Sequence, residues 1–196
     1  ELGFQEQRTS DFVASRLQSF GVEVHRGIGK TGVVGVLRSG ASKRSVGLRA
    51  DMDALPIQEE NSFEYKSKNK GRMHACGHDG HTTMLLGAAK YLSATRNFDG
   101  TVHLIFQPAE EGRGGAEAMV KDGLFDKFPC EQIFGMHNRP KLDVGKFAIR
   151  SGPQMAGGGL FDIHITGKGA HGARPETGVD PVIIATQIIS ALQSVV

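Results

Sequence analysis

The chain has 196 residues, of which 39% are hydrophobic and 22% are charged, a balance typical of a domain with a packed core rather than of a disordered chain. Its 23 Lys and Arg residues and 21 Asp and Glu residues leave a formal net charge of only +2. A charge this small, with the basic residues scattered, predicts binding neither to nucleic acid nor to an acidic membrane surface.

Hydrophobic residues recur at helical and strand spacings over the first 136 positions. The expected helices cover residues 9–20, 79–94 and 115–122, and the expected strands cover 22–25, 32–37, 45–52, 101–106 and 133–136. Strands that alternate with helices in this way predict an α/β domain with a mostly parallel central sheet flanked by helices.

The pattern changes near position 152, where a glycine-rich connector begins. The run 160–166 then alternates between apolar and polar residues, which predicts a strand with one face in water. Asp180 is placed to cap a helix that begins at Pro181. We therefore expect one domain over 1–152 and the start of a smaller α+β domain over 153–196.

Three further features concern the setting of the chain. It begins without Met and ends inside an apolar helix with no stop signal, so we expect a fragment of a longer protein. Cys76 and Cys130 are the only cysteines, too few for a disulfide framework, which favours the reducing cytoplasm. No apolar run is long enough to predict a membrane span.

Acidic and imidazole side chains follow the ends of three predicted core strands. Asp51 and Asp53 come at the end of the strand 45–52. Glu110 and Glu111 follow the strand 101–106, and His137 follows the strand 133–136. Ligands of open α/β sheets bind outside the carboxyl ends of the strands, so these distant segments are expected to meet at one place. His137 on its own would be a structural histidine, and it is a candidate only together with the others.

The segment 73–81 reads Met-His-Ala-Cys-Gly-His-Asp-Gly-His and is the densest cluster of metal-ligand types in the chain. Thiolate and imidazole are preferred ligands of zinc-like metals, so Cys76 and His78 are candidate ligands. The N-terminus of the helix expected near Asp79 favours a thiolate. Two other interpretations remain open here: Cys76 as a thiol nucleophile activated by a histidine, and an ordinary surface turn.

The adjacent residues Glu110 and Glu111 could take two different roles in metal-assisted catalysis. Adjacent residues of an extended chain point to opposite sides, so one carboxylate could bind metal while the other acts as general base towards water. An isolated acidic pair is more commonly a solvated turn, and only its position at a strand end favours the functional interpretation.

The run 167–172 formally matches the dinucleotide-binding pattern G-x-G-x-x-G. No helix is expected to start there, so we reject that interpretation. His171, inside this glycine-rich turn, is instead expected to be an exposed polar group that faces a substrate.

Six short motifs occur in a fixed order along the chain. They are Glu-Leu-Gly-Phe at 1–4, Arg-Ala-Asp-Met-Asp-Ala-Leu-Pro at 49–56, His-Ala-Cys-Gly-His-Asp at 74–79, Gln-Pro-Ala-Glu-Glu-Gly at 107–112, Gly-Met-His-Asn at 135–138 and Gly-Ala-His-Gly at 169–172, with Asp-Pro at 180–181 after them. Together they resemble the M20 family of metallopeptidases and amidohydrolases, in particular its hippurate hydrolases, N-acyl-amino-acid deacetylases and auxin-conjugate hydrolases.

The resemblance implies a zinc-peptidase-like catalytic domain over 1–152 with two divalent metal ions, which could be Zn, Mn, Co or Ni. Cys76 would bridge the two ions. His78, Glu111 and His137 would be terminal ligands.

The resemblance also implies the catalytic residues. Glu110 would be the general base, and Asp53 matches the acid of the family's His-x-Asp element, whose His position is taken here by Asp51. His171 matches a histidine of the lid domain that contacts the substrate carbonyl.

The implied reaction is hydrolysis of the amide bond of a small N-acyl amino acid or peptide by a metal-activated water. A homodimer formed through the lid domain, which would begin at 153, is implied as well. Relatives carry one more His ligand, and no matching residue follows His171. This departure would permit one alternative, a metal-binding but catalytically incomplete protein. A second alternative, a thiol-dependent hydrolase that uses Cys76, also stays open.

Overall fold

The computed structural model describes residues 1–155 and 157–195, and the chain divides into two units, Glu1–Leu142 and Asp143–Val196. We call them the N-terminal and C-terminal units. The domain boundary expected after 152 lies within the C-terminal unit, and the assignment of a catalytic and a lid domain stays a prediction. No helix of the described ranges is both long and apolar enough to cross a lipid bilayer.

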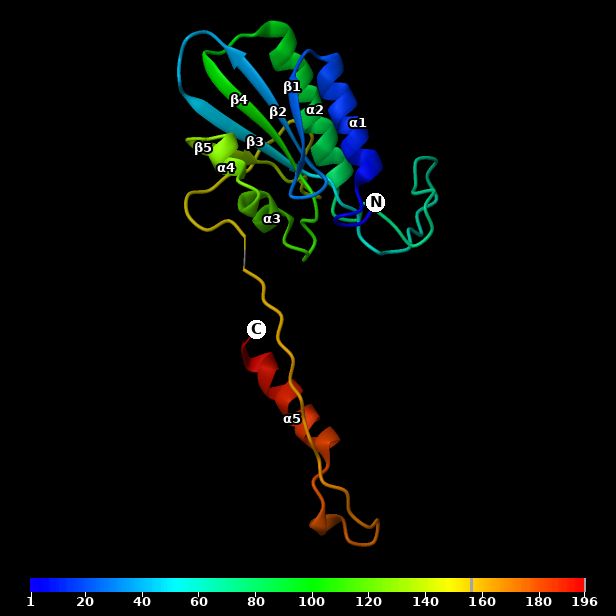
Figure 1. The fold of residues 1–196 in the computed structure, drawn as a ribbon. Coiled ribbons are helices and arrows are strands. Elements are labelled where there is room, and N and C mark those ends of the chain that lie inside the picture. The colour runs from blue at the N-terminus through cyan, green and yellow to red at the C-terminus, as the bar shows by residue number, and fades with distance from the viewer. Residues whose placement is uncertain (156, 196) are drawn as a thin grey trace. The chain divides into compact units, whose positions relative to one another are not determined.

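The N-terminal unit is built on one five-stranded sheet (Figure 1). Its strands are β1 (Glu23–Ile28), β2 (Gly32–Ser39), β3 (Ser45–Asp51), β4 (Gly100–Gln107) and β5 (Gln132–Gly135), in the spatial order β1-β2-β4-β3-β5. β3 pairs in parallel with β4 and β5, whereas β2 is antiparallel to β1 and β4. The predicted α/β fold is confirmed. The sheet is mixed rather than mostly parallel, because two of its four strand pairings are antiparallel.

Four helices of the N-terminal unit cover the two faces of this sheet. They are α1 (Gln7–Ser19), α2 (His78–Thr95), α3 (Gly115–Lys121) and α4 (Leu124–Lys127). Side chains alternate along β4, so Leu104 and Phe106 pack in one buried cluster with α1 and α2 while Ile105 packs in a second with Met119 and Phe128. The helix α2 lies between β3 and β4 in the chain and provides the crossover that a parallel pair requires.

The first helix begins earlier than its sequence predicts. Thr9 and Ser10 are typical capping residues, yet Glu6 occupies the N-cap and α1 starts at Gln7. The backbone N–H of Thr9 is instead bound at 2.8 Å by the Glu1 carboxylate, which therefore supplies the cap from outside the helix.

The C-terminal unit contains α5 (Pro181–Leu192) and two short 3-10 turns, η1 (Pro175–Thr177) and η2 (Gln193–Val195). The predicted cap is confirmed, because Asp180 Oδ1 accepts a hydrogen bond from the Val182 N–H at 2.9 Å. The strand predicted over 160–166 was wrong: these residues are in no strand, and the nearest pairing is an isolated bridge between Lys168 and Val179. A strand needs a paired neighbour, and the described part of this unit offers none.

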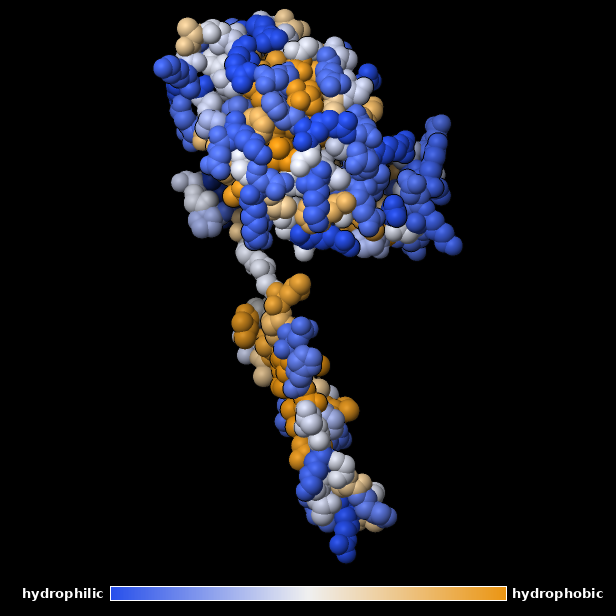
Figure 2. All heavy atoms as spheres, viewed as in Figure 1, coloured by the Kyte–Doolittle hydropathy of each residue, from blue (hydrophilic) through white to orange (hydrophobic). Residues whose placement is uncertain are grey.

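Apolar side chains are exposed along α5, as Figure 2 shows. They include Val182 at 64%, Ile183 at 55% and Ile189 at 59% exposure, and no residue of the helix is buried. Apolar side chains exposed along one helix are typical of a segment that packs against another surface.

Candidate metal centre

Four elements bring the candidate residues to one edge of the sheet. Asp51 is the last residue of β3, the Glu110-Glu111 pair follows β4, and His137 follows β5. These strands are neighbours and run parallel, so their carboxyl ends share an edge. The N-terminus of α2 lies at the same place and supplies His78. The predicted convergence of distant segments is thereby found in the structure.

His78 is the central side chain of the cluster. It is 1% exposed and follows Gly77, whose φ of +86° lets the chain turn sharply into α2. The His78 Nδ1 lies 3.1 Å from Asp53 Oδ1, so Nδ1–H donates to this carboxylate. The Asp53 contact therefore fixes the ring and leaves a lone pair on Nε2, as is usual where a carboxylate holds the other nitrogen of a metal-binding histidine.

Two buried acceptor atoms, one of His78 and one of Glu111, face each other in the cluster. Nε2 of His78 and Oε1 of Glu111 are 3.8 Å apart, and neither has a hydrogen-bond partner in the described part of the chain. Glu110 Oε2 is also 3.8 Å from the same Nε2. Buried polar atoms without partners are destabilising, and a divalent cation between these acceptors would satisfy them. The donor set thus fits a metal ion.

A thiol and a second imidazole complete the cluster. Cys76 Sγ lies 3.3 Å from His137 Nε2. His137 Nδ1 donates to the Asn138 carbonyl oxygen at 2.7 Å, so its Nε2 also presents a lone pair. One ligand atom each from Cys76, His78 and His137 lies within 4.8 Å of the others. Sulfur, imidazole and carboxylate together are a ligand set for Zn-like and neighbouring divalent ions.

The electrostatics of the cluster oppose a free thiolate. Burial, a hydrogen bond to Glu111 and the negative charges of Glu111, Glu110 and Asp51 raise the pKa of the Cys76 thiol to about 11. A cysteine nucleophile needs the opposite shift. A thiol that ligates metal loses its proton as the metal binds, so a raised pKa is compatible with that role.

Burial raises the pKa of Asp53, but hydrogen bonds from His78 and from backbone N–H groups outweigh burial and leave the pKa below its usual value. Burial lowers the pKa of His78, and the Asp53 hydrogen bond with the nearby carboxylates more than reverses this, so the pKa is raised. Because Asp53 is ionised, its hydrogen bond from the His78 Nδ1–H is charge-assisted and stronger than one between two neutral groups.

A supporting network lies behind the cluster, and sequence reasoning missed most of it. His81 Nδ1 donates to Asp51 Oδ1 at 2.6 Å, and Arg49 Nη1 donates to Asp51 Oδ2 at 2.7 Å. Nε2 of His81 accepts the Asn138 N–H at 3.0 Å. Asp51, His78 and His81 also approach one another closely enough for a metal, but Asp51 and His81 satisfy each other. The spacing of His81 three residues after His78, on one helix face, was the signal available.

The two adjacent glutamates do not point to opposite sides, contrary to the sequence prediction. The segment is a turn rather than an extended chain, because Ala109 has a φ of +50°. Both carboxylates consequently approach the same atom, His78 Nε2.

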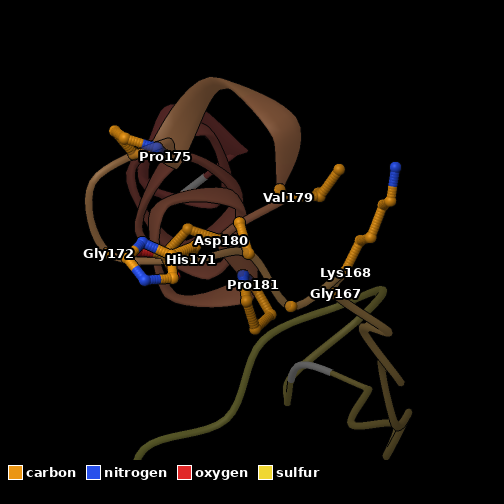
Figure 3. A pocket seen from close by; sticks show the side chains of 11 residues that line it. Gly167, Lys168, His171, Gly172, Pro175, Val179, Asp180 and Pro181 are labelled. Atoms are coloured by element: carbon orange, nitrogen blue, oxygen red, sulfur yellow. The ribbon is translucent and has the colours of Figure 1, made fainter.

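His171 belongs to the C-terminal unit, in an exposed turn. It lines an open cavity of about 520 Å³ together with Lys168 and Asp180 (Figure 3). The Ala173 N–H donates to His171 Nδ1 at 3.1 Å, so the ring proton is on Nε2. Its substrate-binding role stays a prediction.

Comparison with known proteins places these features in a family. The family model described as peptidase family M20/M25/M40 matches residues 47–196. Hippurate hydrolase of Campylobacter jejuni is 55% identical over 196 residues, which are 100% of this chain and 51% of the relative. An N-acyl-L-amino acid amidohydrolase of Geobacillus stearothermophilus is 49% identical over 199 residues, covering 100% of this chain and 53% of the relative.

A solved structure supports the same relationship. A Bacillus subtilis protein described as a dinuclear metal binding peptidase from the M20 family is 41% identical, with a TM-score of 0.74 over 78% of this chain and 43% of that one. The chain spans about half the length of the curated relatives it matches. The resemblance of its motifs is confirmed, and the chain belongs to peptidase family M20/M25/M40.

Proposed function

We propose that the full-length protein hydrolyses the amide bond of N-acyl amino acids or related small amides and peptides. One observation carries the proposal: buried acceptors of His78 and Glu111, which have no hydrogen-bond partner among the described residues, face each other beside the Glu110 carboxylate. The names of the hippurate hydrolase and N-acyl-L-amino acid amidohydrolase relatives support this substrate class.

The proposed cofactor is a pair of divalent ions, either Zn, Mn, Co or Ni. His78, Glu111 and His137 would be terminal ligands and Cys76 would be shared between the ions, as the resemblance to the family implies. The ligand atoms of Cys76, His78 and His137 form one close group, and those of His78, Glu110 and Glu111 form another. When bound, such ions polarise a substrate carbonyl and lower the pKa of water to about 7. The chain's own contribution is to hold each imidazole by Nδ1 so that Nε2 faces the centre.

Glu110 is the general base of this proposal. Its side chain is 42% exposed, so water and substrate can reach it, while its Oε2 stays 3.8 Å from His78 Nε2. Glu110 accepts the proton of the water that attacks the carbonyl carbon. It then donates this proton to the amine nitrogen as the C–N bond breaks. His171 Nε2–H would donate to the carbonyl oxygen, where negative charge develops.

Replacement of the base tests the assignment. Glu110→Gln should lower kcat for benzoylglycine or another N-acyl amino acid by about 10²–10⁴-fold. Metal content, measured by elemental analysis, should not change. The matched control is Glu117→Gln, an exposed glutamate of α3 that pairs with Lys121 and should keep full activity. A near-normal kcat in Glu110→Gln would show that another group is the base.

The two alternatives predict different inhibition patterns. A thiol-dependent hydrolase would be inactivated by alkylation of Cys76 and would resist chelators, but the raised pKa of this thiol disfavours it. A metal-binding, catalytically incomplete protein would retain metal and hydrolyse none of the amides offered. The proposed enzyme should lose activity to a chelator and regain it with added Zn, Mn, Co or Ni.

We also propose a cytoplasmic homodimer that forms through the C-terminal unit. The exposed apolar residues of α5 support a partner surface there. Cys76 and Cys130 are both free thiols, as is usual in a reducing compartment.

A further inference from the structure

A buried carboxyl group lies at the start of α1, outside the candidate metal centre. The Glu6 side chain is 0% exposed. Its Oε2 accepts the Thr31 hydroxyl at 2.7 Å, and its Oε1 accepts the backbone N–H of Ala109 at 2.8 Å. Glu6 thus ties the turn between β1 and β2 to the segment that follows β4. Burying a carboxyl group costs free energy, so the buried position of Glu6 calls for a structural or functional explanation.

Ala109 has an unusual backbone and immediately precedes the proposed base. Its φ is +50°, in the left-handed region that L-residues with a side chain disfavour. Such conformations persist where the surroundings enforce them. Ala109 is 0% exposed, its carbonyl accepts the Gly115 N–H at 3.0 Å, and Gly3 lies so close that a Cβ there would be 3.1 Å from the Ala109 Cα. The hydrogen bond from the Ala109 N–H to Glu6 is the contact through which a side chain helps to hold this backbone conformation.

The turn that carries the two glutamates is therefore held on both sides by a buried carboxylate. Glu6 accepts the N–H of Ala109, and Asp53 Oδ2 accepts the N–H of Glu111 at 3.0 Å. Glu110 lies between these two anchored peptide groups. A rotation at Ala109 would move both glutamate side chains away from His78 Nε2, which each now approaches to 3.8 Å.

We propose that Glu6 is a positioning residue: by binding the Ala109 N–H it sets the backbone turn that directs Glu110 and Glu111 at the metal centre. For Glu110 this inference rests on the proposed hydrolytic function. For Glu111 it concerns metal affinity alone and stands apart from catalysis.

The test compares three variants of the full-length protein: Glu6→Ala, Glu6→Gln and the control Thr31→Val. Glu6→Ala should lower kcat by about 100-fold, since a displacement of roughly 1 Å has that effect, with KM little changed. It should also weaken Co²⁺ affinity by about 10–100-fold in an absorption titration, the loss that is usual when a group that orients a metal ligand is removed. Glu6→Gln should restore both, because its amide oxygen accepts the Ala109 N–H while its amide NH2 donates to the Thr31 hydroxyl.

The matched control is Thr31→Val, which removes the other hydrogen bond of Glu6 and leaves the Ala109 contact intact. It should unfold at a lower temperature yet keep kcat and Co²⁺ affinity. Equal losses of kcat and Co²⁺ affinity in Glu6→Ala and Thr31→Val would reduce Glu6 to a stabilising role and overturn the proposal. Unchanged kcat and Co²⁺ affinity in Glu6→Ala would overturn it as well.

A further variant, Gly3→Ala, tests the proposal if Glu6→Ala does not fold. Gly3→Ala places a methyl group against Ala109 and forces it to shift by a few tenths of an ångström while Glu6 stays intact. Lower kcat and weaker Co²⁺ binding are expected, and unchanged values would contradict the proposal. If the unaltered protein hydrolyses no amide, the proposed function fails, and the Co²⁺ titrations alone still decide the role of Glu6.

Discussion

Asp53 binds a different neighbour with each carboxylate oxygen, and this double contact leads to a prediction. Oδ1 accepts from His78 Nδ1 at 3.1 Å, and Oδ2 accepts from the Glu111 N–H at 3.0 Å. Asp53→Asn places an NH2 group against one of these donors. We expect metal affinity to fall by about 10–100-fold, as measured by competition with a chromogenic chelator.

The control for Asp53→Asn is Asp79→Asn. Asp79 is an exposed aspartate in the first turn of α2, and its Oδ1 accepts the N–H of the neighbouring Gly80. This variant should bind metal as the unaltered protein does. Equal metal affinity in Asp53→Asn and the unaltered protein would show that His78 needs no orienting carboxylate.

Single residues of the site were predictable to different degrees. Cys76 and His78 stand out because ligand types are crowded there, and the structure finds both in the cluster. The relation of Asp53 to His78 could not be read from the sequence, because it depends on how β3 packs beside α2. His81 was overlooked for the same reason: its partner Asp51 lies thirty positions away in the chain.

At the scale of elements, the start of α2 depends on one glycine. Gly77 has a φ of +86°, and a Cβ there would lie 2.3 Å from Asn138 Nδ2. Gly77→Ala should therefore destabilise the fold by roughly 1–3 kcal/mol through backbone strain alone, and more through the clash. It should also displace His78 and weaken metal binding. Denaturant unfolding and a metal titration measure the two effects.

Gly87→Ala is the matched control within the same helix. Gly87 lies mid-helix, and a Cβ there would meet nothing within 4 Å. This variant should stabilise the protein by about 0.5–1 kcal/mol because alanine is the better helix former. Destabilisation of similar size in both variants would mean that α2 tolerates no side chain at either glycine, and that the left-handed N-cap has no special role.

Elements with strong periodicity were predictable, and turns were not. The strands β2 and β4 and the helix α2 occur where apolar residues recur at regular spacing. The conformation of Ala109 escaped prediction because alanine carries no signal for a positive φ; it is enforced by Gly3, Glu6 and Gly115. The strand expected at 160–166 shows the converse, since its alternation is real but pairing decides whether a strand forms.

At the scale of the whole molecule, the site is a product of topology. Parallel pairing of β3 with β4 and β5 brings residues from three distant segments to one edge of the sheet, and the start of α2 adds a fourth. The order of motifs identified the family, and the rule that ligands bind at strand ends placed the site. Substrate selection stays a prediction, because His171 lies in the C-terminal unit.

Because its ligands come from different segments, metal binding should stabilise the N-terminal unit as a whole. At a free metal concentration about 100-fold above Kd, the free energy of unfolding should rise by ~2.7 kcal/mol. Cys76→Ser should lose most of this increase, since it removes the thiol that approaches His137. Cys130→Ser should keep it, because Cys130 contacts the Phe128 carbonyl outside the cluster. Thermal unfolding with and without Zn²⁺ measures the difference, and an equal metal-induced shift in both variants would place the bound metal elsewhere in the molecule.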